Sequence, residues 1–253
     1  MKTVYDLFPE IDEQRKREFY PDIKDEIFWK VFELSKPFSM LSVEGFYNLY
    51  RSVQYIARRG IRGDLVECGV FLGGSVLAMS EFAHHFGLGD RKIYLYDTFN
   101  GFPEGSSDVD LGGNVLKFVS HSSFFKMDQG DMDEAEVDTL VASKVMATVR
   151  EALAMSRYQM KNFKLIAGMV EETLLKDKPG QIALLRLDTD YYDSTRVEFE
   201  QLYPLLVRGG VLIVDDYGHF EGARKATDEY LQEIGSAPLL NRISYTIRCG
   251  VKL

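Results

Sequence analysis

The chain has 253 residues, a formal net charge of −9 and 45% hydrophobic residues. Its length favours one large α/β domain with additions over two domains. The negative charge argues against nucleic acid or an anionic membrane as a partner. No apolar run reaches the roughly 18 residues of a membrane span, and the N-terminus lacks the features of a signal peptide. We therefore expect a cytoplasmic protein with no nucleic-acid or membrane partner.

Cysteine and histidine contribute little to the prediction of a site. The two cysteines, Cys68 and Cys249, lie in apolar surroundings and are expected to be reduced packing residues. The four histidines show no metal-ligand spacing, which argues against zinc.

Residues 1–60 are predicted to form a helical N-terminal extension, followed by a main domain over 61–253. Apolar residues at helical spacing predict a short helix over 27–34 that ends before Pro37, and a second helix over 42–59 that Ser42 caps. Three aromatic residues in this region either belong to the core, as we expect, or line a ligand: Trp29, Tyr47 and Tyr50.

The next stretch has the order strand, glycine turn, helix. Leu65–Gly69 reads as a short apolar strand, a turn with Gly73 follows, and Ser75 starts a helix. The spacing is not the G-x-G-x-x-G of nicotinamide enzymes. Glycine here either allows a ligand to approach the backbone or merely relieves a tight turn.

A second strand, 92–96, ends at Asp97. An acidic residue at this place in a nucleotide-binding unit binds ribose hydroxyls, although turn capping is the ordinary alternative. Beyond it, an insert at about 101–160 begins with a long acidic stretch that is either a lid or a surface excursion, and continues as a helix over 137–160. A third strand, 163–166, leads to a glycine turn at Gly168, which should also face the site.

Two further apolar runs, 182–187 and 211–214, each stop at carboxylates. Their continuity is typical of strands covered on both faces of a parallel sheet. Between them we predict a helix from Ser194 to about Leu206 that exits through 208–210, so that the whole piece forms one βαβ unit. A further helix closed by Gly235 and a final strand, which could form one arm of an antiparallel pair, complete the chain.

The carboxylates after these two strands are Asp188, Asp190, Asp215 and Asp216. Ligands bind outside the carboxyl ends of such strands. Four carboxylates there would repel one another unless a cation lies among them or a proton is shared, and an oxygen-only cluster suits Mg²⁺. The alternative is that they serve as N-caps and turn residues. Arg186, inside the strand, is expected to pair with one of these acids.

Four ordered motifs together resemble the macrocin O-methyltransferase family: GDLVECGVFLGGS, YLYDTFNGFPEG, LLRLDTDYYDST and GGVLIVDDYG. The resemblance covers about residues 47–230, apart from much of 106–158. It implies a class I methyltransferase fold with a Rossmann-like, mostly parallel sheet, S-adenosylmethionine as methyl donor, Mg²⁺, and a sugar hydroxyl of a small-molecule glycoside as acceptor. A homo-oligomer, expected to be a dimer, is also implied.

The resemblance assigns roles to individual residues. It places the methionine moiety of the cofactor near Glu67, Gly69 and Gly73, beside Ser75, and its ribose on Asp97. The implied metal ligands are Asp188, Asp215 and Asp216, and the implied general base is Asp190. His219 departs from the pattern. It could be a substrate contact, a residue that supports the site, or part of the loop surface. The acidic insert is a second departure and leaves the acceptor open.

The sequence leaves other functions open. A metal-dependent O-methyltransferase for a catechol-like phenol is the nearest alternative, because a phenol is acidic enough to need no separate carboxylate base. A non-catalytic cofactor-binding module is the second. A nicotinamide dehydrogenase is the least consistent with the glycine spacing.

Overall fold

The structure is a computed structural model that describes residues 17–100, 110 and 134–253. Most of the acidic stretch expected to form a lid, residues 101–109 and 111–133, lies outside the described residues. None of the helices in the described part of the chain combines the length and the apolar composition that a membrane span requires.

The chain begins with helices that build one outer layer. Helix α2 (Glu26–Ser35) starts where the Asp25 carboxylate accepts a hydrogen bond from the backbone N–H of Ile27. Helix α3 (Val43–Arg59) is capped by Ser42, as predicted, and is followed by Gly60 in the left-handed conformation. Two short 3₁₀ helices, η2 and η3, span Arg17–Phe19 and Lys36–Phe38.

The described residues form a seven-stranded sheet with the order β3-β2-β1-β4-β5-β7-β6. Neighbouring strands from β3 to β5 are parallel, whereas β7 is antiparallel to both of its neighbours. This order confirms the predicted class I methyltransferase fold. The strands are β1 (Asp64–Cys68), β2 (Ile93–Asp97), β3 (Phe163–Ala167), β4 (Ile182–Leu187), β5 (Leu206–Val214), β6 (Asn241–Arg242) and β7 (Arg248–Val251).

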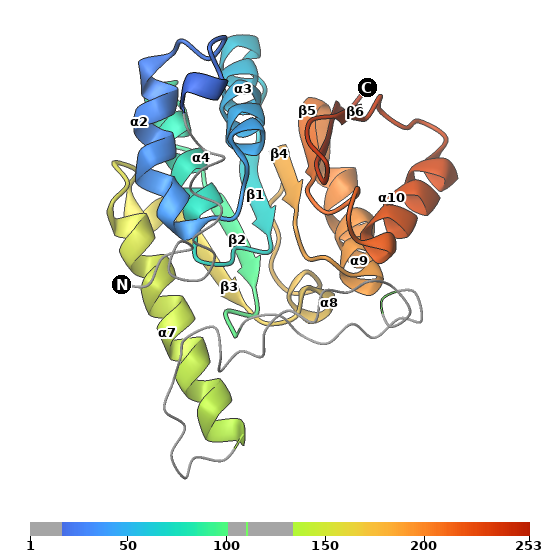
Figure 1. Cartoon of the computed structure of the whole chain (residues 1–253). Helices are drawn as coiled ribbons and strands as arrows, with labels where there is room; N and C mark the ends of the chain where they lie inside the picture. The colour runs from blue at the N-terminus through green and yellow to red at the C-terminus, as the bar shows by residue number, and fades with distance from the viewer. Residues whose placement is uncertain (1–16, 101–109, 111–133) are drawn as a thin grey trace.

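Helices cover both faces of the sheet (Figure 1). One apolar cluster joins α2, α3, α4 (Gly74–His85) and the last turns of α7 (Glu134–Ala154) to one face. The other joins α9 (Tyr192–Leu202), α10 (Glu221–Ile234) and the short α8 (Val170–Thr173) to the opposite face. Buried apolar side chains alternate between these clusters along β1, and along β4 from Leu184 onward, because successive strand residues point to opposite faces.

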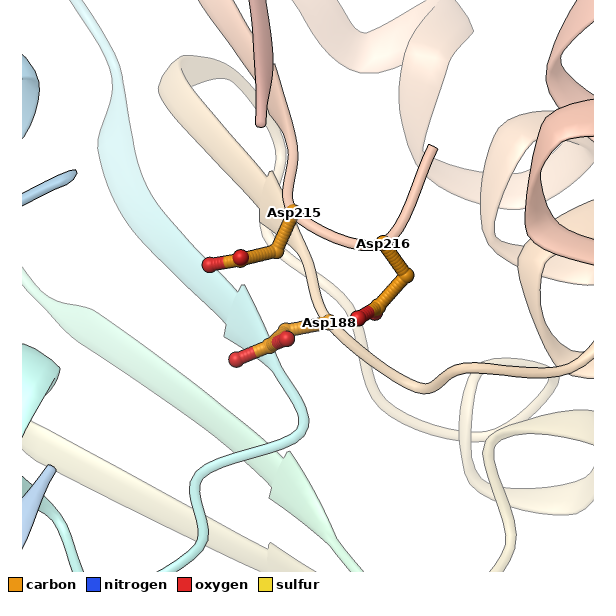
Figure 2. Close-up of side chains that lie close together, drawn as sticks. All are labelled: Asp188, Asp215 and Asp216. Carbon is orange, nitrogen blue, oxygen red and sulfur yellow. The ribbon is translucent and has the colours of Figure 1, made fainter. Parts of the chain in front are cut away.

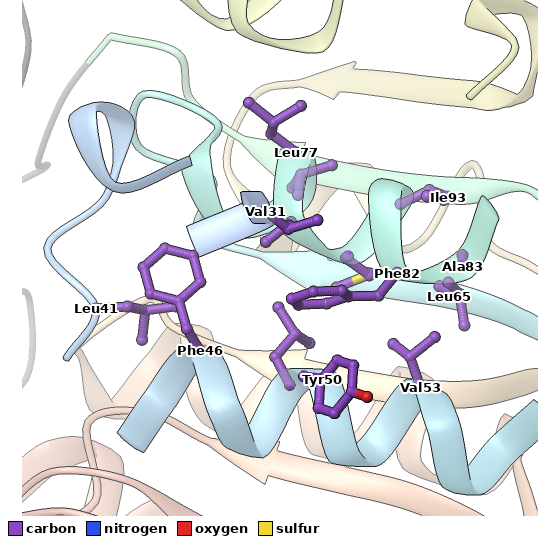
Figure 3. Packing of buried hydrophobic residues seen from close by; sticks show 14 of the residues in the cluster. Val31, Leu41, Phe46, Tyr50, Val53, Leu65, Leu77, Phe82, Ala83 and Ile93 are labelled. Carbon is purple, nitrogen blue, oxygen red and sulfur yellow. The ribbon is translucent and has the colours of Figure 1, made fainter. Parts of the chain in front are cut away.

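The aromatic residues of the N-terminal helices belong to the core, as expected. Trp29 and Tyr50 are buried, and Tyr47 packs against the same cluster. Tyr50 and Phe82 lie close together (Figure 3), and their rings pack edge-on with centroids 5.1 Å apart. These helices are therefore held to α4 by a buried aromatic interface.

The predicted helix from Ser194 to Leu206 is wrong at both ends. The helix begins at Tyr192 and ends at Leu202, a 3₁₀ turn η5 (Tyr203–Leu205) follows, and strand β5 already starts at Leu206. Residues 208–210 thus lie inside a strand, because Gly209 and Gly210 exchange backbone hydrogen bonds with Lys252 near the C-terminus. Helix α7 also differs from its prediction, since it ends at Ala154 rather than Met160, and a 3₁₀ turn η4 (Met160–Asn162) leads into β3.

Candidate active site

The carboxyl ends of β1 and β4 meet where the strand order reverses. From β1 the sheet continues through β2 to β3 on one side. On the other side it continues through β4 to β5. In open parallel sheets, ligands bind in the crevice that this reversal opens at the carboxyl ends. The glycine turn after β1 and the aspartates after β4 and β5 all lie at this edge.

Three of the predicted aspartates form a compact cluster. Asp188 follows β4, and Asp215 and Asp216 follow β5. One carboxylate oxygen from each lies within 4.8 Å of the other two (Figure 2). The cluster follows directly from the parallel register, in which Leu187 lies beside Val214.

Asp190 reaches the same cluster by a turn. An extended continuation of β4 would place Asp190 on the same side as Asp188, but Asp190 instead has a φ of 68° in the left-handed region. The turn brings its backbone N–H to 3.3 Å from Oδ2 of Asp216, and the two carboxyl groups also hydrogen-bond to each other. The predicted base and the predicted ligands therefore share one site.

Arg186 connects the aspartates with the first strand. Its guanidinium is 3% exposed and lies 2.7 Å from both Glu67 and Asp188, with Asp215 as a third partner. The predicted pairing of Arg186 with an acid of the cluster is thus confirmed. Glu67 also contacts Arg186, because the pairing of β1 with β4 places Glu67 and Arg186 side by side on the same face of the sheet.

Negative charge exceeds positive charge in this buried group. Burial and the neighbouring acids raise the pKa of Asp188, Asp190 and Asp216 well above the usual range of a carboxyl. Burial opposes the charge of Arg186, but Asp188, Asp215 and Glu67 raise its pKa well above its ordinary value. One guanidinium cannot neutralise so many carboxylates, so the site favours an added proton or cation.

Glu67 and Ser75 form the centre of the predicted cofactor group. Glu67 is fully buried, and its Oε1 accepts hydrogen bonds from the Ser75 hydroxyl and from Arg186. Burial raises the pKa of Glu67, which Arg186 and Ser75 partly offset. Its second oxygen, Oε2, is buried without a hydrogen-bond partner among the described residues. A buried acceptor of this kind fits a ligand that donates a hydrogen bond.

Two glycines of this group are required by the backbone itself. Gly69 has a φ of 80°, and a Cβ there would lie 1.8 Å from the carbonyl oxygen of Asp188. Gly73, with a φ of 90°, precedes α4 in the left-handed conformation. The close approach at Gly69 ties the glycine turn after β1 directly to the first aspartate after β4.

Asp97 holds this glycine turn in place. Its Oδ2 accepts hydrogen bonds from the backbone N–H groups of Val70 (2.5 Å) and Phe71 (3.1 Å), and its Oδ1 accepts one from Phe99 (2.7 Å). Burial nevertheless raises its pKa. Its carbonyl oxygen accepts from the N–H of Gly168, which has the predicted turn conformation with a φ of 132°. The capping role weighed for Asp97 is therefore present.

Some residues of the site carried no signal in the sequence. The Thr189 hydroxyl bonds to Glu198, a helix residue that is fully buried, and the Thr246 hydroxyl lies 3.4 Å from Asp215 Oδ1. At the rim, the His219 ring lies 3.4 Å, through Nδ1, from the hydroxyl of Tyr245. The residues of each pair belong to no common sequence motif, so their spacing in the sequence does not reveal the contact.

The residues present fit both groups that the resemblance implies. Asp188, Asp215 and Asp216 offer only carboxylate oxygens at mutual distances suited to one small, hard cation such as Mg²⁺. The unpartnered Oε2 of Glu67 and the glycine backbone beside it suit a ligand with an ammonium group that approaches closely.

The chain is similar in sequence to known O-methyltransferases. A family model described as Macrocin-O-methyltransferase (TylF) matches residues 34–247. The 8-demethyl-8-(2,3-dimethoxy-alpha-L-rhamnosyl)-tetracenomycin-C 4'-O-methyltransferase of Streptomyces olivaceus is 27% identical over 82% of this chain and 73% of its own length. The mycinamicin III 3''-O-methyltransferase of Micromonospora griseorubida is 28% identical over 78% and 71%, respectively.

A solved structure supports the fold. The O-methyltransferase NovP superposes with a TM-score of 0.68 at 24% identity, covering 85% of this chain and 82% of NovP. At this level of identity the likeness bears on the fold alone.

Proposed function

Because the chain belongs to the Macrocin-O-methyltransferase (TylF) family and is thus an S-adenosylmethionine-dependent O-methyltransferase, we propose that it methylates a sugar hydroxyl of a small-molecule glycoside with the help of Mg²⁺. The similar proteins of known activity support a sugar acceptor, since one is named for a rhamnosyl tetracenomycin and another, from Streptomyces niveus, for demethyldecarbamoylnovobiocin. The dimer and the division at residue 60 stay predictions.

One observation carries the proposal: the acidic cluster lies directly beside the glycine turn. Asp188 contacts that turn through its carbonyl oxygen at Gly69 and contacts Arg186 through its carboxylate. Arg186 in turn contacts Glu67. A methyl donor held at the turn and an acceptor held at the aspartates would therefore be neighbours, as group transfer requires.

Asp188, Asp215 and Asp216 would hold the Mg²⁺ ion. When bound, the ion would lower the pKa of a coordinated sugar hydroxyl and offset the mutual repulsion of the carboxylates. This matters because an alcohol is a weak acid, and a carboxylate alone deprotonates it poorly.

Asp190 would act as the general base. Its carboxyl group accepts the proton of the acceptor hydroxyl, while that oxygen forms a bond to the methyl carbon and the bond from this carbon to sulfur breaks. The bonding electron pair remains on sulfur, which leaves S-adenosylhomocysteine as the product. The turn at Asp190 brings its backbone N–H to Asp216, which supports a site where base and ligands would share the acceptor.

The cofactor would contact the glycine turn on the other side. Glu67 Oε2 would accept from the ammonium group of the methionine moiety, next to Ser75, while Gly69, Gly73 and Gly168 keep the surrounding backbone accessible. Asp97, which accepts hydrogen bonds from three backbone N–H groups and from the Thr98 side chain, would bind the ribose at the end of β2.

Aromatic side chains at the rim would receive the acceptor. Tyr191 follows Asp190 directly, and its ring packs edge-on against Phe220. The His219 ring packs against Phe220 and against Tyr245, which is 61% exposed. Faces of aromatic rings suit the apolar face of a sugar, so we assign His219 to acceptor contact.

The proposal is tested by methyl transfer to a set of rhamnosides and catechols, with release of S-adenosylhomocysteine measured by mass spectrometry. We expect turnover with rhamnosides, its loss in EDTA and its recovery with Mg²⁺. Turnover with catechols only would support the phenol alternative. Undiminished turnover in EDTA would rule out the metal.

Substitutions separate the role of the base from that of a ligand. Asp190→Asn should reduce kcat at least 100-fold, because general base catalysis contributes about 10²–10⁴-fold, yet retain Mg²⁺ and S-adenosylhomocysteine binding. Asp215→Asn should lose Mg²⁺ binding and activity together. Asp64→Asn, at the amino end of β1, is the control and should behave like the wild type. An active Asp190→Asn enzyme at neutral pH would exclude Asp190 as the base.

A further inference from the structure

Thr189 separates the predicted ligand Asp188 from the predicted base Asp190, and a buried carboxyl group holds its side chain. The Thr189 hydroxyl donates a hydrogen bond of 3.0 Å to Oε1 of Glu198. We propose that Glu198 is a positioning residue, which orients Asp188 and Asp190 relative to each other by fixing Thr189. This inference rests on the roles given to the two aspartates in the proposed function.

The loop is tied at its other polar groups as well. Before Thr189, the backbone N–H of Asp188 donates to the Cys68 carbonyl oxygen at 2.9 Å, in continuation of the sheet. After it, the Thr189 carbonyl oxygen accepts from the backbone of Tyr191 and from the Ser194 hydroxyl. The hydrogen bond from the Thr189 hydroxyl to Glu198 adds a side-chain contact to these backbone contacts.

The position of Glu198 is unusual for a charged residue. It lies on the face of α9 that packs on the sheet, with an exposure of 0%, and its carboxyl group also hydrogen-bonds to the thiol of Cys68. Its Oε2 has no hydrogen-bond partner among the described residues, and neither has Oε2 of Glu171 on α8. Such burial is costly, and an apolar residue would fill the same space without that cost. The hydrogen bond to Thr189 explains why a carboxyl group, rather than an apolar side chain, occupies this position.

The protonation state of Glu198 is compatible with its role as the acceptor of the Thr189 hydrogen bond. Burial, with a contribution from Glu171, raises the pKa of Glu198 to about 8. At neutral pH the group is therefore mostly uncharged. It accepts the hydrogen bond from Thr189 without adding a further negative charge beside the aspartate cluster.

The geometry explains why positioning is needed here. Asp190 has a left-handed backbone conformation without being glycine, which is unfavourable and persists only where neighbouring contacts hold it. A base and a metal ligand two residues apart must keep their relative placement to within a fraction of an ångström. Release of the Thr189 side chain would allow the loop to relax and would move both aspartates.

The test measures metal binding in the full-length protein. The probe is Mn²⁺, followed by electron paramagnetic resonance, with binding of S-adenosylhomocysteine by calorimetry as an independent measure of an intact site. Thr189→Val keeps the shape but removes the donor, and Glu198→Ala removes the acceptor. Both should weaken Mn²⁺ binding about 10- to 100-fold, the usual effect of losing a residue that orients a ligand, and should leave S-adenosylhomocysteine binding unchanged.

Conservative variants serve as the controls. Thr189→Ser keeps the hydroxyl, and Glu198→Gln keeps an oxygen at the place of Oε1, so both should retain the wild-type affinity for Mn²⁺. A structural role alone would not produce this pattern of loss and rescue. If Glu198→Ala does not fold, Thr189→Val against Thr189→Ser decides the matter on its own.

Two results would overturn the inference. The first is wild-type Mn²⁺ affinity in Thr189→Val, and the second is a loss in Thr189→Ser as large as that in Thr189→Val. A wild-type protein that does not bind Mn²⁺ would instead contradict the metal in the proposed function, and the inference would fall with it.

Discussion

At Arg186, one guanidinium serves three carboxyl groups from three strands. Glu67, Asp188 and Asp215 all contact it in a nearly water-free place. A planar guanidinium with five N–H donors reaches several acceptors at once, which an ammonium group on a flexible chain does less well. The residue therefore organises the acids that the proposed metal and cofactor would use.

Removal of this charge should be costly for stability. Arg186→Gln leaves buried carboxylates without their partner, and we expect a loss of about 3–5 kcal/mol in the free energy of unfolding. The measurement is urea denaturation in EDTA at neutral pH. Arg196→Gln is the matched control, because Arg196 pairs with Glu200 and Glu233 at the surface, where an ion pair contributes less than about 1 kcal/mol. Equal losses in the two variants would contradict this account of Arg186.

At the scale of elements, the sequence predicts strands well where the signal is local. The apolar run 182–187 and the carboxylates after it are contiguous, so both the strand and the cluster at its end were predictable. The segment after α9 was not, because the glycines at 209 and 210 normally indicate a break. Their strand conformation depends on hydrogen bonds to Lys252, which local pattern does not contain.

The turn at Asp190 was not predicted, and the sequence left ribose binding and turn capping open for Asp97, for a similar reason. An extended segment and a turn both place an aspartate near the cluster, and only the φ of Asp190 distinguishes them. The three backbone N–H groups that Asp97 binds belong to two different loops. Contacts between elements, rather than propensities within them, decide such details.

The contact between the first glycine turn and the loop after β4 is testable. Gly69→Ala would place a Cβ against the backbone of Asp188, which cannot move aside as a flexible side chain does. Gly87→Ala is the control, since Gly87 has nearly the same φ, 78°, with no atom within 4 Å of the added Cβ. We expect the control to lose about 1–3 kcal/mol through backbone strain, and Gly69→Ala to lose at least about 2 kcal/mol more through overlap. Denaturant midpoints measure both, and similar values would refute the close approach.

At the scale of the whole molecule, the two layers of helices bury acidic groups together with the apolar core. Glu198 and Glu200 look alike in the sequence of α9, yet Glu198 faces the sheet and Glu200 faces solvent. The amphipathic pattern predicts the helix but does not identify a carboxyl group on its apolar face. The consequence is a link between protonation and global folding, which only the assembled structure reveals.

The contribution of Glu198 to the free energy of unfolding should decrease as the pH rises. The pKa of Glu198 is about 8 in the folded protein, against 4.5 as the ordinary value of a glutamate. Between these values the folded chain retains a proton that the unfolded chain has lost, so the contribution of Glu198 to stability is greatest below pH 4.5. It falls as the pH rises towards 8, by at most about 1.4 kcal/mol per pH unit, and is constant above that. Glu198→Gln carries no such proton, and its stability relative to the wild type should therefore increase from pH 5 to pH 8.

Urea denaturation of both proteins at several pH values, in EDTA, measures this difference. The other buried acids are common to the two proteins and cancel in the comparison, which isolates Glu198. Glu200→Gln, at the exposed position two residues further along α9, should leave the pH profile as in the wild type. A difference between wild type and Glu198→Gln that is independent of pH would mean that Glu198 is already ionised in the folded protein, and that a charged rather than a neutral carboxyl group holds Thr189.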